Sequence, residues 1–295
     1  MKYAQIGRSA LQVSQIGFGC MSLSNTGAAE ATEMIKTAID AGINYFDTAD
    51  LYDKGANEQL IGELLKPVRK KILLATKVGN QWRQDGSGWN WNPRKDYILS
   101  AVDESLRRLQ TDYIDLYQLH GGTIEDNIDE TIEAFELLVQ QGKIRYYGIS
   151  SIRPNVIRRY VEKSNIQSVM MQYSLLDRRP EEQMLNYLKK SGVSVLARGV
   201  LAQGILIDKP AKSYLGYTPE EVSLLQQQME KLPGSNTALA LQYTLSKQAV
   251  SSAIIGFRTL QQLNESITAV QEQESIESVN LLGQLLEAKI YQEHR

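Results

Sequence analysis

The chain has 295 residues, with 32 lysines and arginines against 34 aspartates and glutamates and a formal net charge of −2. This balance predicts no binding to nucleic acid or to an anionic membrane surface, because both require an excess of basic residues. No stretch reaches the roughly 18 apolar residues of a membrane-spanning helix. A single cysteine, Cys20, excludes an internal disulfide bond and leaves no Cys/His metal site, so we expect a cytoplasmic protein without a metal.

Short aliphatic runs alternate with helical patterns along the whole chain. Residues 72–75 and 193–196 are typical of buried parallel strands, whereas residues 128–139 and 260–270 repeat apolar side chains at helical spacing. Eight such strands are predicted, each followed by a helix, and this repeat predicts a closed α/β barrel, the (β/α)8 TIM barrel. Their expected ends lie near Gly19, Asp47, Lys77, His120, Ser150, Gln172, Arg198 and Ile255. No linker interrupts the pattern, so residues 1–295 should form one domain.

Four features do not belong to this repeat: an N-terminal hairpin, a C-terminal helix and two long connections. Residues 3–6 and 11–13 predict an N-terminal β-hairpin that closes the bottom of the barrel, and residues 275–291 predict an extra C-terminal helix. Two connections are longer than a barrel needs: residues 79–96, with Trp82, Trp89 and Trp91, and residues 204–235, with a helix-like stretch at 219–232. Long aromatic connections are often functional walls or lids, although the tryptophans can equally form a packing cluster under the loop.

Polar residues at the carboxyl ends of barrel strands are the candidates for catalysis. Asp47, Lys77 and His120 hold such positions, and Tyr52 follows Asp47 by five residues. A buried lysine needs a partner, which Asp47 supplies, and its charge makes the phenol of Tyr52 a better proton donor. A neutral His120 can orient the carbonyl oxygen that receives this proton. None of these groups supplies a hydride, so carbonyl reduction implies a nicotinamide cofactor.

Three segments in this order resemble the signatures of the aldo-keto reductase superfamily: residues 45–52 (YFDTADLY), 74–77 (LATK) and 115–120 (DLYQLH). The resemblance continues through residues 142–150 (GKIRYYGIS) and 254–258 (IIGFR), and so covers essentially the whole chain. It implies an oxidoreductase that uses NADPH to reduce aldehydes and ketones to alcohols. Tyr52 would be the proton donor, Lys77 and Asp47 would tune it, and His120 would orient the small carbonyl substrate.

The resemblance also implies the residues that hold NADPH or NADP+. Ser150 and Gln172 would contact the nicotinamide carboxamide, and Arg198 stands where many members have a tyrosine stacked on the nicotinamide ring. The other expected cofactor contacts are Gly19, Met21, Asp47, Ser151, Leu201, Gln203, Gly204, Gly256, Phe257, Arg258, Gln262, Glu265 and Ser266. At Ser151 and Ser266 the family more often has asparagine, so these two contacts depart from the common pattern.

Simpler structural roles exist for several of these residues. Ser150 and Ser151 can cap a helix that begins near Pro154, Gln172 can satisfy backbone groups of the barrel, and Arg258 can be an ordinary surface residue.

Two other functions also fit the sequence. One is a lyase or aldolase that uses Lys77 as a Schiff base. The other is an NADP-binding regulatory subunit with slow turnover. The sequence predicts neither the physiological substrate nor the oligomeric state.

Cofactor preference should depend on Arg258, whose guanidinium can pair with a 2′-phosphate that NADH lacks. We expect NADPH to bind at least about tenfold more tightly than NADH, equivalent to ~1.4 kcal/mol. Fluorescence titration with both cofactors measures this ratio, and added salt should weaken NADPH binding more than NADH binding. Equal dissociation constants would contradict the role of Arg258.

Overall fold

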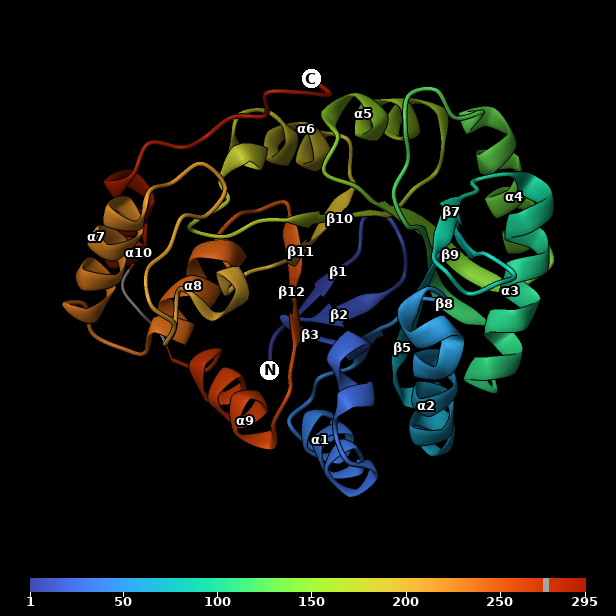
Figure 1. Cartoon of the computed structure of the whole chain (residues 1–295), viewed down its shortest axis with the longest axis horizontal. Coiled ribbons are helices and arrows are strands. Elements are labelled where there is room, and N and C mark those ends of the chain that lie inside the picture. The colour runs from blue at the N-terminus through green and yellow to red at the C-terminus, as the bar shows by residue number, and fades with distance from the viewer. Residues whose placement is uncertain (273–275) are drawn as a thin grey trace.

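Eight parallel strands close into a barrel at the centre of the molecule (Figure 1). The computed structural model describes residues 1–272 and 276–295. Around the barrel the strands follow the order β10-β11-β12-β3-β4-β5-β8-β9, which confirms the predicted TIM barrel. The barrel strands are β3 (Ile16–Gly19), β4 (Tyr45–Asp47), β5 (Leu73–Val78), β8 (Ile114–Leu119), β9 (Ile144–Ser150), β10 (Ser168–Gln172), β11 (Ser194–Arg198) and β12 (Val250–Gly256).

A helix follows each barrel strand, and together these helices form the outer ring visible in Figure 1. Each buries an apolar stripe against the strands, as α1 does with Met34, Ile35 and Ala38. The ring consists of α1 (Ala28–Asp40), α2 (Ala56–Leu65), α3 (Lys95–Leu109), α4 (Ile128–Gln140), α5 (Pro154–Lys163), α6 (Met184–Lys190), α8 (Asn236–Leu245) and α9 (Leu260–Ala269). No helix of the described ranges is long and apolar enough to span a membrane.

Short 3-10 turns connect several of these elements. They are η1 (Cys20–Asn25), η2 (Tyr52–Gly55), η3 (Lys66–Lys71), η4 (Arg179–Glu181) and η5 (Ala202–Gly204). Three of them, η1, η2 and η5, follow the carboxyl ends of β3, β4 and β11, at the end of the barrel where the catalytic candidates were predicted.

The N-terminal hairpin consists of β1 (Tyr3–Gln5) and β2 (Gln12–Ser14), which pair in antiparallel fashion as predicted. It lies across the end of the barrel, in the middle of the view in Figure 1. Ile6, Leu11 and Val13 are buried in one cluster with side chains from the barrel strands, including Tyr45 and Leu116. The hairpin therefore seals the barrel interior at the end opposite the catalytic candidates.

The C-terminal helix α10 (Ile276–Leu285) is shorter than predicted, and the expected continuation to Tyr291 is wrong. Side chains from distant segments bond to the backbone just beyond the end of the helix. Arg178 donates to the backbone oxygen of Leu286, and the Tyr217 hydroxyl donates to that of Glu287. The expected first residue of this helix, Ser275, lies outside the described residues.

The two long connections contain regular structure of their own. The first, residues 79–96, forms a small antiparallel hairpin of β6 (Asn80–Trp82) and β7 (Trp89–Trp91), which the sequence did not predict as strands. The second contains α7 (Pro219–Glu230), where a helix-like stretch was expected. The helix α7 begins with a capping box: the Thr218 hydroxyl accepts a bond from the backbone N–H of Glu221, and the Glu221 carboxylate accepts one from the backbone N–H of Thr218.

Close packing of α2 on α3 depends on Gly62. A Cβ atom at this position would lie 2.5 Å from the backbone oxygen of Arg108 and 2.6 Å from the carbonyl carbon of Leu109. We expect Gly62→Ala to lower the free energy of unfolding by about 1–3 kcal/mol, the usual cost of overpacking. The control is Gly88→Ala, because its Cβ atom would meet only the flexible Arg83 side chain at 3.8 Å. Urea-induced unfolding tests the pair, and equal midpoints would argue against this packing.

Candidate active site

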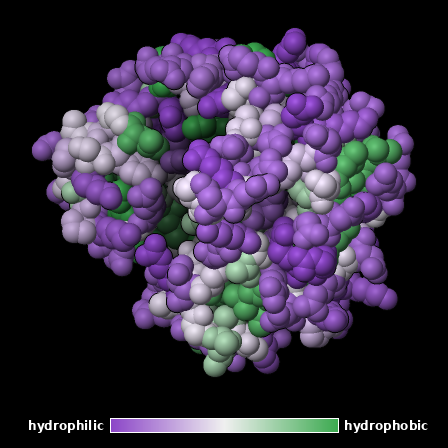
Figure 2. Space-filling model, turned by 45° about the vertical axis from the view of Figure 1, so that its right-hand side comes forward, coloured by the Kyte–Doolittle hydropathy of each residue, from purple (hydrophilic) through white to green (hydrophobic). Residues whose placement is uncertain are grey.

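A cavity of about 730 Å³ opens at the carboxyl ends of the barrel strands. Figure 2 shows a deep hollow in the surface, with hydrophobic residues visible inside it. The predicted catalytic residues Asp47, Tyr52, Lys77 and His120 all line this cavity. The ends of three neighbouring strands, β4, β5 and β8, therefore bring these side chains to one place.

The ammonium group of Lys77 is the centre of the site and is almost completely buried. Its Nζ lies 2.5 Å from Oδ2 of Asp47, 2.7 Å from the backbone oxygen of Thr48 and 3.3 Å from the hydroxyl of Tyr52. Gln118 donates to the other carboxylate oxygen of Asp47 at 3.2 Å. The buried charges are thus paired and hydrogen-bonded, as burial requires.

The charge on Lys77 persists despite its burial. Burial disfavours the ammonium, but the nearby Asp47 carboxylate and Tyr52 hydroxyl outweigh it, so the pKa of Lys77 lies above its usual value. Burial also raises the pKa of Asp47, against the attraction of Lys77. A cation held beside the Tyr52 oxygen stabilises the negative charge that forms there when the phenol gives up its proton.

His120 is neutral in this environment. Burial, followed by the positive charges of Lys77 and Arg198, lowers the pKa of His120 from 6.5 to about 3. Its ring stands edge-on to that of Tyr52, with the centroids 5.9 Å apart. Both rings border the cavity, so a carbonyl oxygen placed between them can accept hydrogen bonds from a phenol and a neutral imidazole.

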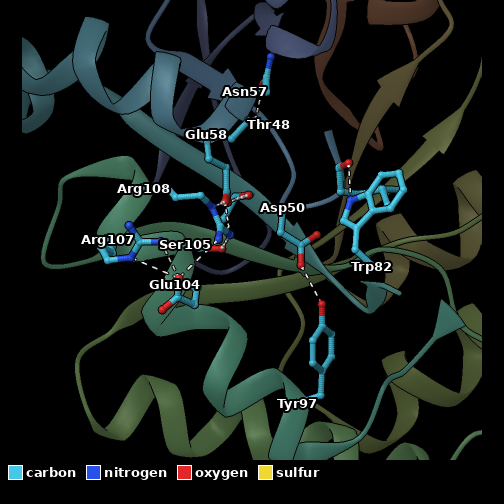
Figure 3. Close-up of polar contacts among 12 residues, drawn as sticks. Thr48, Asp50, Asn57, Glu58, Trp82, Tyr97, Glu104, Ser105, Arg107 and Arg108 are labelled. Carbon is cyan, nitrogen blue, oxygen red and sulfur yellow. Dashed lines mark hydrogen bonds and ion pairs between the residues drawn. The ribbon is translucent and has the colours of Figure 1, made fainter. Parts of the chain in front are cut away.

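The backbone after Tyr52 takes an unusual path. Asp53, Lys54 and Gly55 have φ values of 49°, 54° and 88°, all in the left-handed region. For the two residues that are not glycine this conformation costs about 1–2 kcal/mol each, so surrounding contacts must hold it. The indole Nε1 of Trp82 donates to the backbone oxygen of Leu51 at 3.1 Å (Figure 3).

A second set of contacts supports this turn from the side of α2 and α3. Arg108 lies directly against Gly55, where a Cβ atom would meet its side chain at 2.8 Å. The fully buried Glu58 accepts two bonds from Arg108, with Nε at 2.7 Å (Figure 3). Nearby, Asp50 accepts a bond from Tyr97, and burial together with the charge of Glu58 raises the pKa of Asp50 to about 8.

The structure brings some of the predicted cofactor residues to the cavity and leaves others along its approach. The cavity-lining group consists of Gly19, Met21, Asp47, Ser150, Ser151, Arg198 and Gly256. Gln172 is linked to this group, because its side chain accepts a bond from Arg198 at 3.3 Å and donates one to Tyr214 at 3.1 Å. Leu201, Gln203 and Gly204 lie in the turn after β11.

The remaining predicted cofactor contacts follow β12 or lie on α9: Phe257, Arg258, Gln262, Glu265 and Ser266, which were expected to hold the adenosine half of the cofactor. Arg258 is exposed, and its backbone N–H donates to the Gln262 side chain at 3.0 Å. Glu265 is exposed as well, whereas Ser266 is 3 % exposed. The ring of Phe257 packs against Phe18 in the core, so only its backbone is available to a ligand.

The alternative that the two serines cap α5 is wrong for Ser150. The hydroxyl of Ser151 bonds to the residue before the helix, so Ser151 does not occupy the capping position itself. The capping position of α5 is Arg153, and no side chain caps this helix. Ser151 instead accepts a bond from the Arg153 backbone N–H at 3.2 Å, one residue before the helix begins.

Several residues of the cavity wall were not singled out from the sequence. They follow the strand ends or lie on the β6–β7 hairpin: Asn80, Gly121, Gly122, Thr123, Ile152 and Arg153. Of the three tryptophans, Trp89 and Trp91 line the cavity. Their position in the sequence directly after His120 or Ser151 could have indicated that most of them lie near the site. The direction in which a loop residue faces, however, depends on the folded path of the chain.

Comparison with known proteins identifies the class. A model of the Aldo/keto reductase family matches residues 15–287, and the chain belongs to this family. It is therefore an oxidoreductase of the barrel type.

Individual relatives are similar over most or all of their length. The chain is 50 % identical to the uncharacterized oxidoreductase YqkF of Bacillus subtilis, with all of both chains covered. It is also 50 % identical to the holo form of aldo-keto reductase AKR11C1 from Bacillus halodurans, with a TM-score of 0.96 over 100 % of this chain and 99 % of that one. Aldo-keto reductase yakc [NADP(+)] of Schizosaccharomyces pombe is 36 % identical over 66 % of this chain and 60 % of its own length.

The neutrality of His120 predicts a pH-dependent contribution to stability. The unfolded chain takes up a proton at His120 below pH 6.5, whereas the folded chain does so only near pH 3. The contribution is therefore complete above pH 6.5 and is lost as the pH falls through this window, by up to ~1.4 kcal/mol per pH unit. Between pH 7 and pH 5 the wild type should lose about 2 kcal/mol more than His120→Asn in urea unfolding. Identical pH profiles would show that His120 titrates normally.

Proposed function

We propose that this enzyme reduces aldehydes and ketones to alcohols with NADPH, and that residues 1–295 act as one catalytic domain. The observation that carries the proposal is the contact of one buried ammonium, Lys77, with both Asp47 and the hydroxyl of Tyr52. This arrangement prepares a phenol to donate a proton, and carbonyl reduction is the reaction that consumes one proton and one hydride at the same substrate.

Each residue of the site has a separate task in this reaction. A bound NADPH would supply the hydride. The hydroxyl of Tyr52 donates its proton to the carbonyl oxygen, and Lys77 stabilises the phenolate that remains. His120, neutral because of its burial, orients the carbonyl oxygen with a hydrogen bond.

The residues of the open end of the barrel fit a nicotinamide dinucleotide. Ser150 and Arg198 border the cavity at the point where the ring would lie, and Gln172 bonds to Arg198. Arg258 is exposed, and within the described ranges no carboxylate forms an ion pair with it, so its guanidinium is free for a 2′-phosphate. The name of the Schizosaccharomyces pombe relative includes NADP(+), which also favours this cofactor. The single cysteine agrees with a cytoplasmic enzyme, which stays a prediction.

A Schiff-base mechanism at Lys77 is disfavoured. An imine requires a neutral amine with a free lone pair, whereas the ammonium of Lys77 directs its bonds to Asp47, Thr48 and Tyr52 and stays protonated. The same contacts are those expected of a proton-tuning cation, so an active reductase is also favoured over a regulatory subunit.

Replacement of Tyr52 tests the proton donor. Tyr52→Phe should lower kcat by about 10² or more, the scale of lost general-acid catalysis, and leave the dissociation constant of NADPH nearly unchanged. Lys77→Met should reduce kcat at least as much, because it removes the cation that stabilises the phenolate. Steady-state reduction of an aldehyde, together with fluorescence titration of NADPH, measures both quantities. Normal turnover by Tyr52→Phe would refute the mechanism.

A further inference from the structure

The charged side chains that line the cavity leave an excess of positive charge. Asp47 and Lys77 balance each other, and His120 is neutral. The two remaining charged side chains of the lining are Arg153 and Arg198. Within residues 1–272 and 276–295, neither guanidinium forms an ion pair with a carboxylate. An unbalanced cation in a cleft with low-dielectric walls attracts anionic ligands.

The proposed function accounts for one of these two cations. Arg198 bonds to Gln172 at the end of β10 and lies where the nicotinamide ring is expected. Arg153 follows β9, and its Nη1 donates to the backbone oxygen of Gly122 at 2.7 Å. Gly122 is two residues beyond His120, so this bond ties Arg153 to the loop that follows β8, and both residues line the same cavity. Arg198 belongs to β11, two strands around the barrel from β9.

Two glycines after His120 form the segment of chain to which Arg153 bonds. Gly121 and Gly122 have φ values of 141° and 123°, a region that other residues rarely adopt. A Cβ atom at Gly122 would lie 3.0 Å from Val156, in the first turn of α5, and one at Gly121 would lie 3.2 Å from the ring of Trp91. The glycines thus let the arginine side and the tryptophan side of the cavity meet directly next to His120.

Hydrogen-bonding capacity remains on Arg153. A guanidinium has five N–H donors in a planar fork, and the bond to Gly122 is the one that the structure shows for this side chain. The lining of the same cavity also contains two tryptophans, of which Trp91 is half-buried and Trp89 is 48 % exposed. A ligand here meets flat apolar surfaces and a cation that suits a carboxylate.

We propose that Arg153 binds a carboxylate of the substrate, and that this pocket prefers aldehydes and ketones that carry both a carboxylate and an apolar or aromatic body. This inference rests on the proposed function, because it names the substrate class of the same site and the same reaction. The carboxylate takes no part in the chemistry; it holds the carbonyl group against Tyr52 and His120.

Matched aldehydes test the proposal directly. The 2-, 3- and 4-carboxybenzaldehydes are compared with the corresponding methylbenzaldehydes, which keep the aromatic aldehyde and the position of the substituent but carry no charge. For the wild type, kcat/KM of the best carboxylate isomer should exceed that of its methyl counterpart by about tenfold or more, the range of a hydrogen bond to a charged group. This preference should decrease with rising salt, because it is electrostatic.

Variants assign the preference to one residue. Arg153→Gln should remove it through KM of the carboxylate aldehyde, while turnover of the methylbenzaldehydes is retained. Arg153→Lys should restore part of the preference, because it keeps the charge without the fork. The control is Arg158→Gln, since Arg158 lies on α5, the helix that directly follows Arg153, and lines a different, small cavity.

Three results would overturn the inference. A wild type with no preference for carboxylates excludes it, as does a preference that survives Arg153→Gln. A preference lost in Arg198→Gln but kept in Arg153→Gln assigns the anion to the other arginine. Failure of the proposed function looks different: NADPH then reduces neither the carboxylate nor the methyl aldehydes.

Discussion

A lysine ammonium that is taken out of water must be paired, and this requirement arranges the open end of the barrel. Lys77 is 1 % exposed, and it meets the requirement through Asp47 on the neighbouring strand β4 and through the backbone of Thr48. Removal of one member of the Lys77–Asp47 ion pair would leave the other as a buried unpaired charge, which costs about 3–5 kcal/mol. The pair contributes little net stability by itself, because desolvation offsets the attraction. Its value lies in the position that it imposes on the charge beside Tyr52.

The left-handed turn after Tyr52 lies next to the contact between the Tyr52 hydroxyl and the buried ammonium of Lys77. Tyr52 begins η2, and the two non-glycine residues between Tyr52 and α2 adopt strained conformations. The Trp82 indole on one side and the Glu58–Arg108 pair on the other hold the turn in place. The β6–β7 hairpin therefore contributes twice, because Trp82 anchors the loop that carries Tyr52, and Trp89 and Trp91 line the cavity.

The sequence predicts the barrel well because its signal is long and repeated. Eight strand-and-helix units of regular period leave few alternatives, and the polar residues that end these strands include Asp47, Lys77 and His120. Shorter features lack such a signal. The strands β6 and β7 consist of asparagine, glutamine and tryptophan, without an aliphatic or β-branched residue to mark them as strands. The helix α10 ends where Arg178 and Tyr217, from distant segments, donate hydrogen bonds to the backbone oxygens that follow it.

The same limit applies to the site. Arg153 follows Ser150 closely in the chain, but its place in the cavity results from the bond to Gly122 and from the backbone of two glycines. Phe257 stands in a stretch that resembles a cofactor-binding segment, yet its ring belongs to the core. Which residues end a strand can be predicted from local pattern, whereas the direction of a loop side chain depends on contacts far away in the sequence.

In the proposed reaction, hydride is added to a carbonyl carbon while Lys77 remains a charged partner of Tyr52. The most direct measurement uses NADPH that carries deuterium at the transferable position of the nicotinamide, with an aromatic aldehyde and with borohydride added in a parallel sample. The account predicts one deuterium atom on the carbinol carbon of the product, detected by mass spectrometry, and no substrate adduct on Lys77 after borohydride. A product without deuterium, together with a trapped adduct on Lys77, would contradict it.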